Sequence, residues 1–368
     1  MTFLNLSHGA EIPDFGLSSF LQLRPAERSV GPFPVWELAD GREWSFSNHW
    51  KAPSAELEPI GLHTVRDLMV SRPGVMRIDR FVGYDGATGR EALDGLTEGE
   101  RRACSAESNL IKIKGDVIVA DGISSDIYGH WIVDYLPRFG VVRDLFPERI
   151  RDIPVLLPAG TRRWVYELLA LSCGISQDQI ISYTPGNDVV RCARALLPSY
   201  CYTKEFTFHS YVREFYGSFG TGPGSGKTAA KTRKILISRQ NAGQSNRRFP
   251  HRHHFENMGL DFGYEIIRPE ETSIPEQIRL FSEARVVVGE HGSGMHNAVF
   301  SGPGTVVGCL GFWNSVQLHI GYLMGHTNVY LTRGCGWPTA ERNEFLLGMS
   351  VDDIHSFFEK IENITTAS

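Results

Sequence analysis

Apolar runs alternate with amphipathic stretches along the chain from residue 116 onward. Short apolar runs bounded by glycine, proline or charge are typical of buried strands, and apolar residues that recur every three or four positions indicate helices. Strands are therefore predicted at 116–121, 154–160, 179–183, 234–239, 264–269, 285–289 and 305–310. Helices are predicted at 129–146, 161–173, 251–258 and 274–284, and a further helix is predicted to begin at Gly294.

The alternation of strands and helices predicts parallel sheets that are covered by helices on both faces. Two such halves indicate an α/β chain with two Rossmann-like domains, whose sheets face each other across a cleft. Five glycines and a proline in residues 217–232 predict a linker between an N-terminal domain, 1–216, and a C-terminal domain, 233–368. Residues 1–110 have weak periodicity and predict only short strands and loops. The amphipathic helix predicted at 351–363 fits on either domain.

Composition narrows the class of protein. The 368 residues are 42% apolar and carry a net charge of −5, which is typical of a folded globular chain without a general attraction for nucleic acid. No run approaches 18 apolar residues, and the first ten residues lack the pattern of a signal peptide. These features predict a cytoplasmic protein with no membrane span and at most a peripheral association with membranes. The six cysteines form no C-x-x-C pair and are interpreted as free thiols.

A glycine-rich turn at 286–307 (VVVGEHGSGMHNAVFSGPGTVV) is the strongest local signal. Gly292 and Gly294 let the backbone approach an anion closely, and the helix start presents unpaired N–H groups. The side chains expected to add contacts are Glu290, His291, Ser293 and Asn297. Asn297 stands where a dinucleotide fingerprint needs its last glycine, so NAD is not expected. The alternative interpretation is that the glycines only allow close packing between strand and helix.

Eight Lys or Arg and no Asp or Glu lie between residues 227 and 254. Arg239 and Arg247 follow a predicted strand and are best placed to bind phosphate, which guanidinium groups match in geometry. The other cations, Arg252 among them, are interpreted as a solvated face, and Lys227 as part of the linker. No metal site is predicted, because the chain has no D-x-D motif and the histidines at 251–254 lack nearby carboxylates or cysteines.

Residues 129–138 (GHWIVDYLPR) place polar groups on an apolar helix. His130 and Asp134 are four residues apart and share one face, on which Arg138 also falls. An imidazole oriented by a carboxylate is a suitable general base near neutral pH. The alternative is a surface pair that merely supports the helix.

Taken in order, these motifs resemble glycosyltransferase family 61. The resemblance rests on G-H-W-x-x-D-x-L-P-R at 129–138, I-S-R at 237–239 followed by Arg247 and Arg248, E-Q-I-R-L-F-S-E-A at 276–284, and H-G-x-G-x-x-N with F-x-x-P-G-T at 291–305. This family contains plant xylosyl- and arabinosyltransferases, an O-GlcNAc transferase and many bacterial capsular-polysaccharide proteins. The resemblance implies a GT-B fold, an inverting reaction and a nucleotide-sugar donor in the C-terminal domain.

The expected function is therefore a metal-independent, cofactor-free inverting glycosyltransferase that moves a sugar from a nucleotide sugar, with a UDP-sugar as the expected donor, to a glycan acceptor. In this hypothesis His130 or Asp134 is the base, and Trp131 and Arg138 contact the acceptor. Arg239, Arg247 and residues 290–297 bind the donor. Two alternatives stay open: a polysaccharide pyruvyl transferase, and a non-catalytic carbohydrate-binding protein on the same fold.

Overall fold

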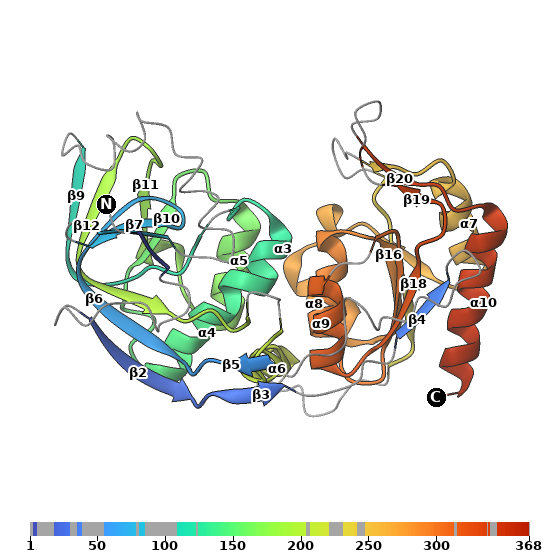
Figure 1. Cartoon of the computed structure of the whole chain (residues 1–368), viewed down its shortest axis with the longest axis horizontal. Coiled ribbons are helices and arrows are strands. Elements are labelled where there is room, and N and C mark those ends of the chain that lie inside the picture. The colour runs from blue at the N-terminus through green and yellow to red at the C-terminus, as the bar shows by residue number, and fades with distance from the viewer. Residues whose placement is uncertain are drawn as a thin grey trace. The chain divides into compact units, whose positions relative to one another are not determined.

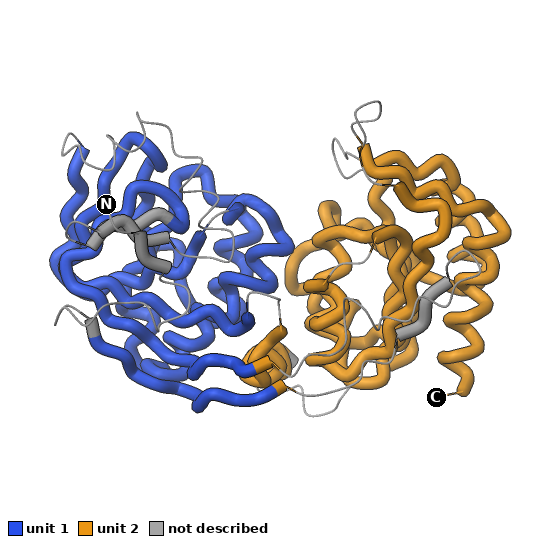
Figure 2. Tube along the Cα trace, viewed as in Figure 1, with its two compact units in different colours: residues 1–28, 56–204 blue, residues 29–55, 205–368 orange. Residues whose placement is uncertain are grey.

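The computed structural model describes residues 3–5, 18–29, 35–38, 55–78, 81–84, 109–122, 124–203, 207–220, 231–240, 247–312, 315–336, 338 and 344–367. The chain divides into two compact units, which Figure 2 shows in different colours. Unit 1 contains residues 1–28 and 56–204, and unit 2 contains residues 29–55 and 205–368. The chain therefore passes from one unit to the other three times.

Unit 1 is built on a mixed sheet of nine strands (Figure 1). Their order is β1 (Phe3–Asn5), β8 (Phe81–Tyr84), β7 (Val75–Ile78), β6 (Ile60–Arg72), β12 (Val189–Pro198), β9 (Leu110–Ile118), β10 (Val155–Pro158) and β11 (Ile180–Tyr183), with β2 (Ser18–Arg24) also paired to β6. The strands from β12 to β11 are parallel to one another. In contrast, β6 is antiparallel to β12, β2 and β7.

The antiparallel half corrects the prediction of a wholly parallel N-terminal sheet. Only Pro73 and Gly74 separate β6 from β7, and Gly74 has a φ of 71°. A two-residue turn joins antiparallel strands, whereas a parallel connection needs a crossover of a dozen residues or more. The parallel half has such crossovers, because helices lie between β9, β10 and β11 in the chain.

The helices of unit 1 follow the parallel strands. After β9 comes a continuous helix made of α3 (Tyr128–His130), a π-helical segment (Trp131–Tyr135) and α4 (Leu136–Leu145). After β10 comes α5 (Arg163–Cys173), which ends at Gly174 in the left-handed conformation. Apolar side chains from β6, β9 and β12, including Val65, Val117 and Val190, form a core on this sheet.

Unit 2 is built on a parallel sheet of six strands. Their order is β15 (Glu265–Ile267), β13 (Arg233–Ile237), β16 (Ala284–Glu290), β17 (Val306–Leu310), β18 (Thr327–Leu331) and β4 (Val35–Leu38). When the strands from β13 to β18 in this sheet are numbered 1 to 5 along the chain, they lie side by side in the order 2-1-3-4-5. This is the doubly wound order of flavodoxin-like sheets. The sixth strand, β4, comes from near the N-terminus and pairs with β18 in parallel.

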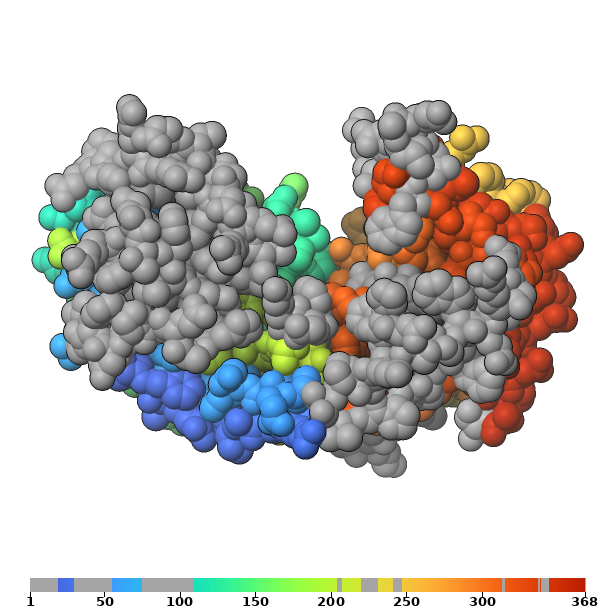
Figure 3. All heavy atoms as spheres, in the orientation of Figure 1, coloured from blue at the N-terminus to red at the C-terminus, as the bar shows by residue number. Residues whose placement is uncertain are grey.

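Further elements of unit 2 surround this sheet. They are α6 (Tyr211–Gly217), α7 (Arg252–Asp261), α8 (Ile274–Ser282), a 3₁₀ helix η6 (Ser293–Phe300), α9 (Ser315–Met324), α10 (Val351–Ala367), and a small sheet of β14 (Arg247–Arg248), β20 (Phe345–Leu347) and β19 (Cys335–Gly336). The terminal helix α10 packs Ile354, Phe357 and Phe358 into the core of unit 2, and Figure 3 shows its outer face in red at the surface.

The unit boundaries differ from the predicted ones. Unit 2 begins at residue 205, so α6 and residues 217–220 belong to it rather than to the first domain or a linker. Residues 29–55 also belong to unit 2, since β4 extends its sheet. The central part of the predicted linker, 221–230 with Lys227, lies outside the described residues. Among the described helices, none is long and apolar enough to cross a membrane.

Candidate active site

The sheet order of unit 2 reverses between β13 and β16. In doubly wound sheets, ligands bind outside the carboxyl ends of the two strands that flank such a reversal. Arg239 follows β13 there, and His291 and Gly292 follow β16. The strand-to-helix turn predicted as a donor site thus lies at the position in this sheet where a ligand is expected.

Two guanidinium groups converge on Gly292. A β-carbon added to this glycine would lie 2.6 Å from Arg239 Nη1 and 2.7 Å from Arg247 Nη1, and the φ of Gly292 is +151°. Arg247 also donates a hydrogen bond to the His291 carbonyl. Neither arginine forms an ion pair with a carboxylate in the part of the chain that the structure describes, and the buried Nε of Arg239 has no hydrogen-bond partner there. The pair therefore offers uncompensated positive charge.

Glu290 does not face these arginines as a free carboxylate. It is 2% exposed, and both of its oxygens accept hydrogen bonds from Arg252 on α7, at 2.6 Å from Nε and 2.9 Å from Nη2. The interpretation of Arg252 as part of a solvated face is therefore wrong. A bidentate pair of this kind fixes both side chains. The positive charge of Arg252 offsets the negative charge of Glu290, so Glu290 is not available to bind a nucleotide-sugar donor.

Burial and nearby positive charge lower the pKa values of Arg247 and His291. Burial, followed by the nearby Arg239, lowers the pKa of Arg247 to about 10, so its guanidinium stays charged at neutral pH. Burial, followed by Arg247, lowers the pKa of His291 to about 3. His291 is therefore a neutral imidazole, which can donate or accept a hydrogen bond but adds no charge.

The helix predicted after the turn is present as the 3₁₀ helix η6. Its first backbone hydrogen bond runs from the Met295 N–H to the Gly292 carbonyl, and Ser293 and Gly294 are half-buried at its start. Asn297 is fully buried and donates a 2.8 Å hydrogen bond to Gln277 Oε1 of α8. Asn297 thus ties η6 to α8, which corrects its assignment as a donor-binding residue.

In unit 1, the helix after β9 brings His130 and Asp134 together. His130 Nδ1 and Asp134 Oδ2 are 2.6 Å apart. The side chain of His130 is 39% exposed, and that of Asp134 only 7%. The five residues from Trp131 to Tyr135 form a π-helical segment, a feature that is rare and often occurs at functional sites.

The two groups change each other's proton affinity. The hydrogen bond to Asp134 raises the pKa of His130, and the charge of Asp126 adds to this effect. Burial raises the pKa of Asp134, against the opposing effects of His130 and Tyr202. The pair therefore retains a proton more strongly than a free imidazole does.

Trp131 has no exposed surface with which to contact an acceptor. Its side chain is fully buried, its Nε1 donates a 2.5 Å hydrogen bond to the Ser125 carbonyl, and its ring packs against Tyr135, Phe139 and Trp164. Its predicted role is wrong because the helix is buried on several sides, so the residues beside His130 belong to the core.

Arg138 is also a structural residue. It is 1% exposed, and it donates hydrogen bonds to the Pro198 carbonyl at 2.9 Å and the Ala120 carbonyl at 3.1 Å. Its guanidinium lies 4.1 Å from the centre of the Tyr200 ring. Arg138 thus joins the helix to the ends of β9 and β12, and it does not reach an acceptor.

Comparison with known proteins complements this geometry. Residues 128–308 match the family model of glycosyltransferase 61. These residues form a glycosyltransferase 61 domain. No curated protein matches the chain. Among solved structures, a flavo di-iron protein mutant from Thermotoga maritima aligns at 9% identity with a TM-score of 0.24, covering 83% of this chain and 91% of that one.

The glycosyltransferase 61 domain makes this chain a glycosyltransferase, which the sequence motifs had predicted. The match includes both the His130–Asp134 pair and the turn at Gly292, so both candidate sites lie inside the domain. In this glycosyltransferase, no group of three or more His, Cys, Asp or Glu side chains is arranged to hold a metal ion within the described ranges.

Proposed function

We propose that this glycosyltransferase binds a nucleotide sugar at the carboxyl ends of β13 and β16, without a metal ion. The observation that carries the proposal is the convergence of Arg239 and Arg247 on Gly292. A donor diphosphate is a doubly charged group that guanidinium donors match well. Because Glu290 is neutralised by Arg252, the two arginines are free to oppose the negative charge that grows on the diphosphate as it leaves.

In this proposal, a side chain of unit 1 removes the proton from the acceptor hydroxyl. His130 is the better base, because its side chain is far more exposed than that of Asp134. Its Nδ1 is bonded to Asp134, so Nε2 is the nitrogen that receives the proton, and Asp134 orients the ring and stabilises the imidazolium. The acceptor oxygen then attacks the anomeric carbon as the bond to the diphosphate breaks, which inverts the configuration.

The GT-B fold that the resemblance to the family implies is part of this proposal. The finer assignments belong to the proposal as well: a UDP-sugar donor, a glycan acceptor in polysaccharide synthesis, and a cytoplasmic location. The supporting residues are those of the turn in unit 2 and of the helix after β9 in unit 1.

Titration calorimetry with UDP tests the donor site. Arg239→Ala and Arg247→Ala should each weaken UDP binding by about 10- to 150-fold, the value of one charge-assisted hydrogen bond of about 1.5–3 kcal/mol. Arg248→Ala is the matched control, because this neighbour of Arg247 is exposed. Equal UDP affinity in all three variants would refute the site.

A further inference from the structure

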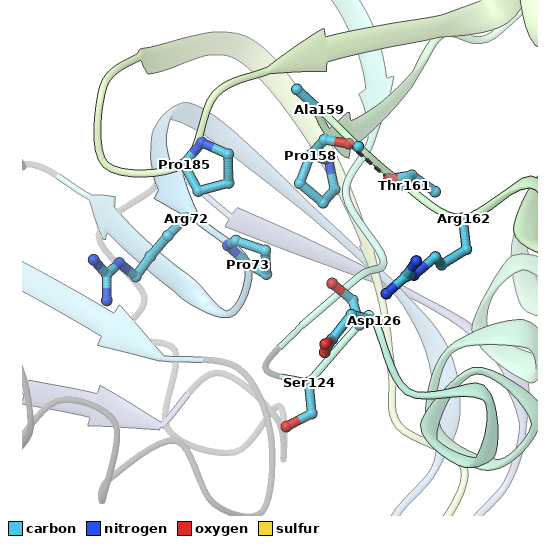
Figure 4. Close-up of a pocket in the computed structure, with 11 residues that line it drawn as sticks. Arg72, Pro73, Ser124, Asp126, Pro158, Ala159, Thr161, Arg162 and Pro185 are labelled. Carbon is cyan, nitrogen blue, oxygen red and sulfur yellow. Dashed lines mark hydrogen bonds between the residues drawn. The ribbon is translucent and has the colours of Figure 1, made fainter. Parts of the chain in front are cut away.

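A pocket lies at the carboxyl ends of the parallel strands of unit 1. It has a volume of about 410 Å³, within the range of about 300–1,000 Å³ that is usual for small-ligand sites. Its walls come from the loops after β9, β10 and β11 and from the β6–β7 turn (Figure 4). Ligands bind at this end of parallel strands in open α/β sheets.

The pocket lies beside the start of the helix that carries the candidate base. Ser125, which lines it, accepts the hydrogen bond from Trp131 Nε1, and Trp131 directly follows His130. Asp126, which also lines it, is near enough to His130 for its charge to act on the imidazole. Ser124 has a φ of +64°, and a strained backbone of this kind often persists at ligand sites.

The side chains around the pocket offer both kinds of hydrogen-bonding group. Arg162 donates only, Asp126 accepts only, and Ser124, Ser125 and Thr161 carry hydroxyl groups. No ion pair joins Arg162 or Asp126 to any residue that the structure describes. In Figure 4, Arg162 points toward Asp126. Their charges cancel within the pocket, which leaves both groups available to a neutral ligand.

Apolar surface completes the lining. Pro73, Pro158 and Pro185 present ring carbons, with Ala159 beside them. Arg72 also lines the pocket, and its side chain points away from these prolines in Figure 4. A wall of carbon opposite a set of mixed donors and acceptors suits a ligand with C–H faces and many hydroxyl groups.

We propose that this pocket binds a neutral sugar residue of the acceptor and directs one of its hydroxyl groups toward His130. Arg162 and Asp126 bind ring hydroxyls, and the prolines pack against the C–H face. The assignment rests on the proposed function, and it replaces Trp131 and Arg138 with exposed groups as the residues that contact the acceptor.

Ligand-observed NMR tests this assignment without requiring the natural acceptor. The probes are methyl β-glucoside, methyl β-galactoside and methyl β-xyloside, with glucuronic acid as a charged counterpart. At least one neutral glycoside should bind the full chain more tightly than glucuronic acid does. Arg162→Gln and Asp126→Asn should each weaken that binding by about fivefold to tenfold, the loss expected for one hydrogen bond.

Arg163→Gln is the matched control, because Arg163 pairs with Glu167 and its side chain is 92% exposed. The proposal is overturned if no neutral glycoside binds, if glucuronic acid binds more tightly, or if Arg162→Gln behaves as Arg163→Gln does. UDP titrated into the same samples separates the two proposals: normal UDP binding without glycoside binding removes only the acceptor pocket, whereas glycoside binding without UDP binding removes only the donor site.

Discussion

Replacing Gly292 by alanine tests the donor site by a change of one methyl group. The new β-carbon would lie 2.6 Å from Arg239 Nη1 and 2.7 Å from Arg247 Nη1. To reach ordinary contact at 3.4 Å, the two guanidinium groups must move apart by about 0.8 and 0.7 Å. The φ of +151° at this position also strains any residue other than glycine, at a cost of about 1–3 kcal/mol.

A displacement of this size is enough to misalign a hydrogen bond from an arginine to a phosphate oxygen. Loss of one such charge-assisted bond is worth about 1.5–3 kcal/mol, which is about 10- to 150-fold in the dissociation constant. We therefore expect Gly292→Ala to weaken UDP binding by that factor, although neither arginine has been changed.

Titration calorimetry measures this effect, and Gly304→Ala is its control. Gly304 has a φ of +80° and open space where a β-carbon would lie, so its replacement costs backbone strain without moving the arginines. Gly304→Ala should lower the thermal stability and leave the UDP affinity unchanged. If Gly292→Ala binds UDP as tightly as the unaltered protein does, the arginines do not hold the diphosphate at this turn.

Four further predictions concern unit 1. His130→Ala should reduce transfer by about 10²- to 10⁴-fold and leave UDP affinity intact; full activity in a transfer assay would exclude His130 as the base. The value of kcat/KM should rise with pH through the pKa of His130, which Asp134 raises, because the base must be unprotonated. Asp134→Asn removes the carboxylate that raises this pKa, so the acid limb of the pH profile should move to lower pH; a limb that stays in place would contradict the coupling. Arg138→Met should lower the free energy of unfolding in urea by about 2–4 kcal/mol, because two buried carbonyl groups lose their donor, and unchanged stability would refute its structural role.

The sequence predicts unit 2 better than unit 1 for a physical reason. A parallel strand that is covered on both faces reads as a continuous apolar run, as in Val286–Val288, and such runs stand out. The long strand β6 (Ile60–Arg72) mixes exposed and buried positions and includes His63, Arg66 and Asp67. This pattern hides an antiparallel strand, so the first half of the mixed sheet was predicted only as short strands and loops.

The candidate site shows the same division. The convergence of Arg239 and Arg247 on Gly292 was predictable, since Arg239 and Gly292 lie just after the carboxyl ends of recognisable strands and Arg247 follows in the loop after the first of them. A count of charges does not reveal which cation pairs with Glu290, and so Arg252 was missed. The proposed acceptor pocket was missed because its lining comes from four separate loops, whereas helical spacing suggested Arg138, which belongs to the core.

The strand β4 has a consequence for how the protein is made. Val35–Leu38 leave the ribosome long before their partner strand, Thr327–Leu331, is synthesised. The sheet of unit 2 therefore cannot acquire its last strand until almost the whole chain has emerged, and such a distant pairing is slow to form. A shortened gene that starts at residue 205 would leave β18 as an open edge, which is prone to pair with other molecules. Expression of unit 2 by itself should therefore include residues 29–55, supplied on the same chain or as a separate peptide.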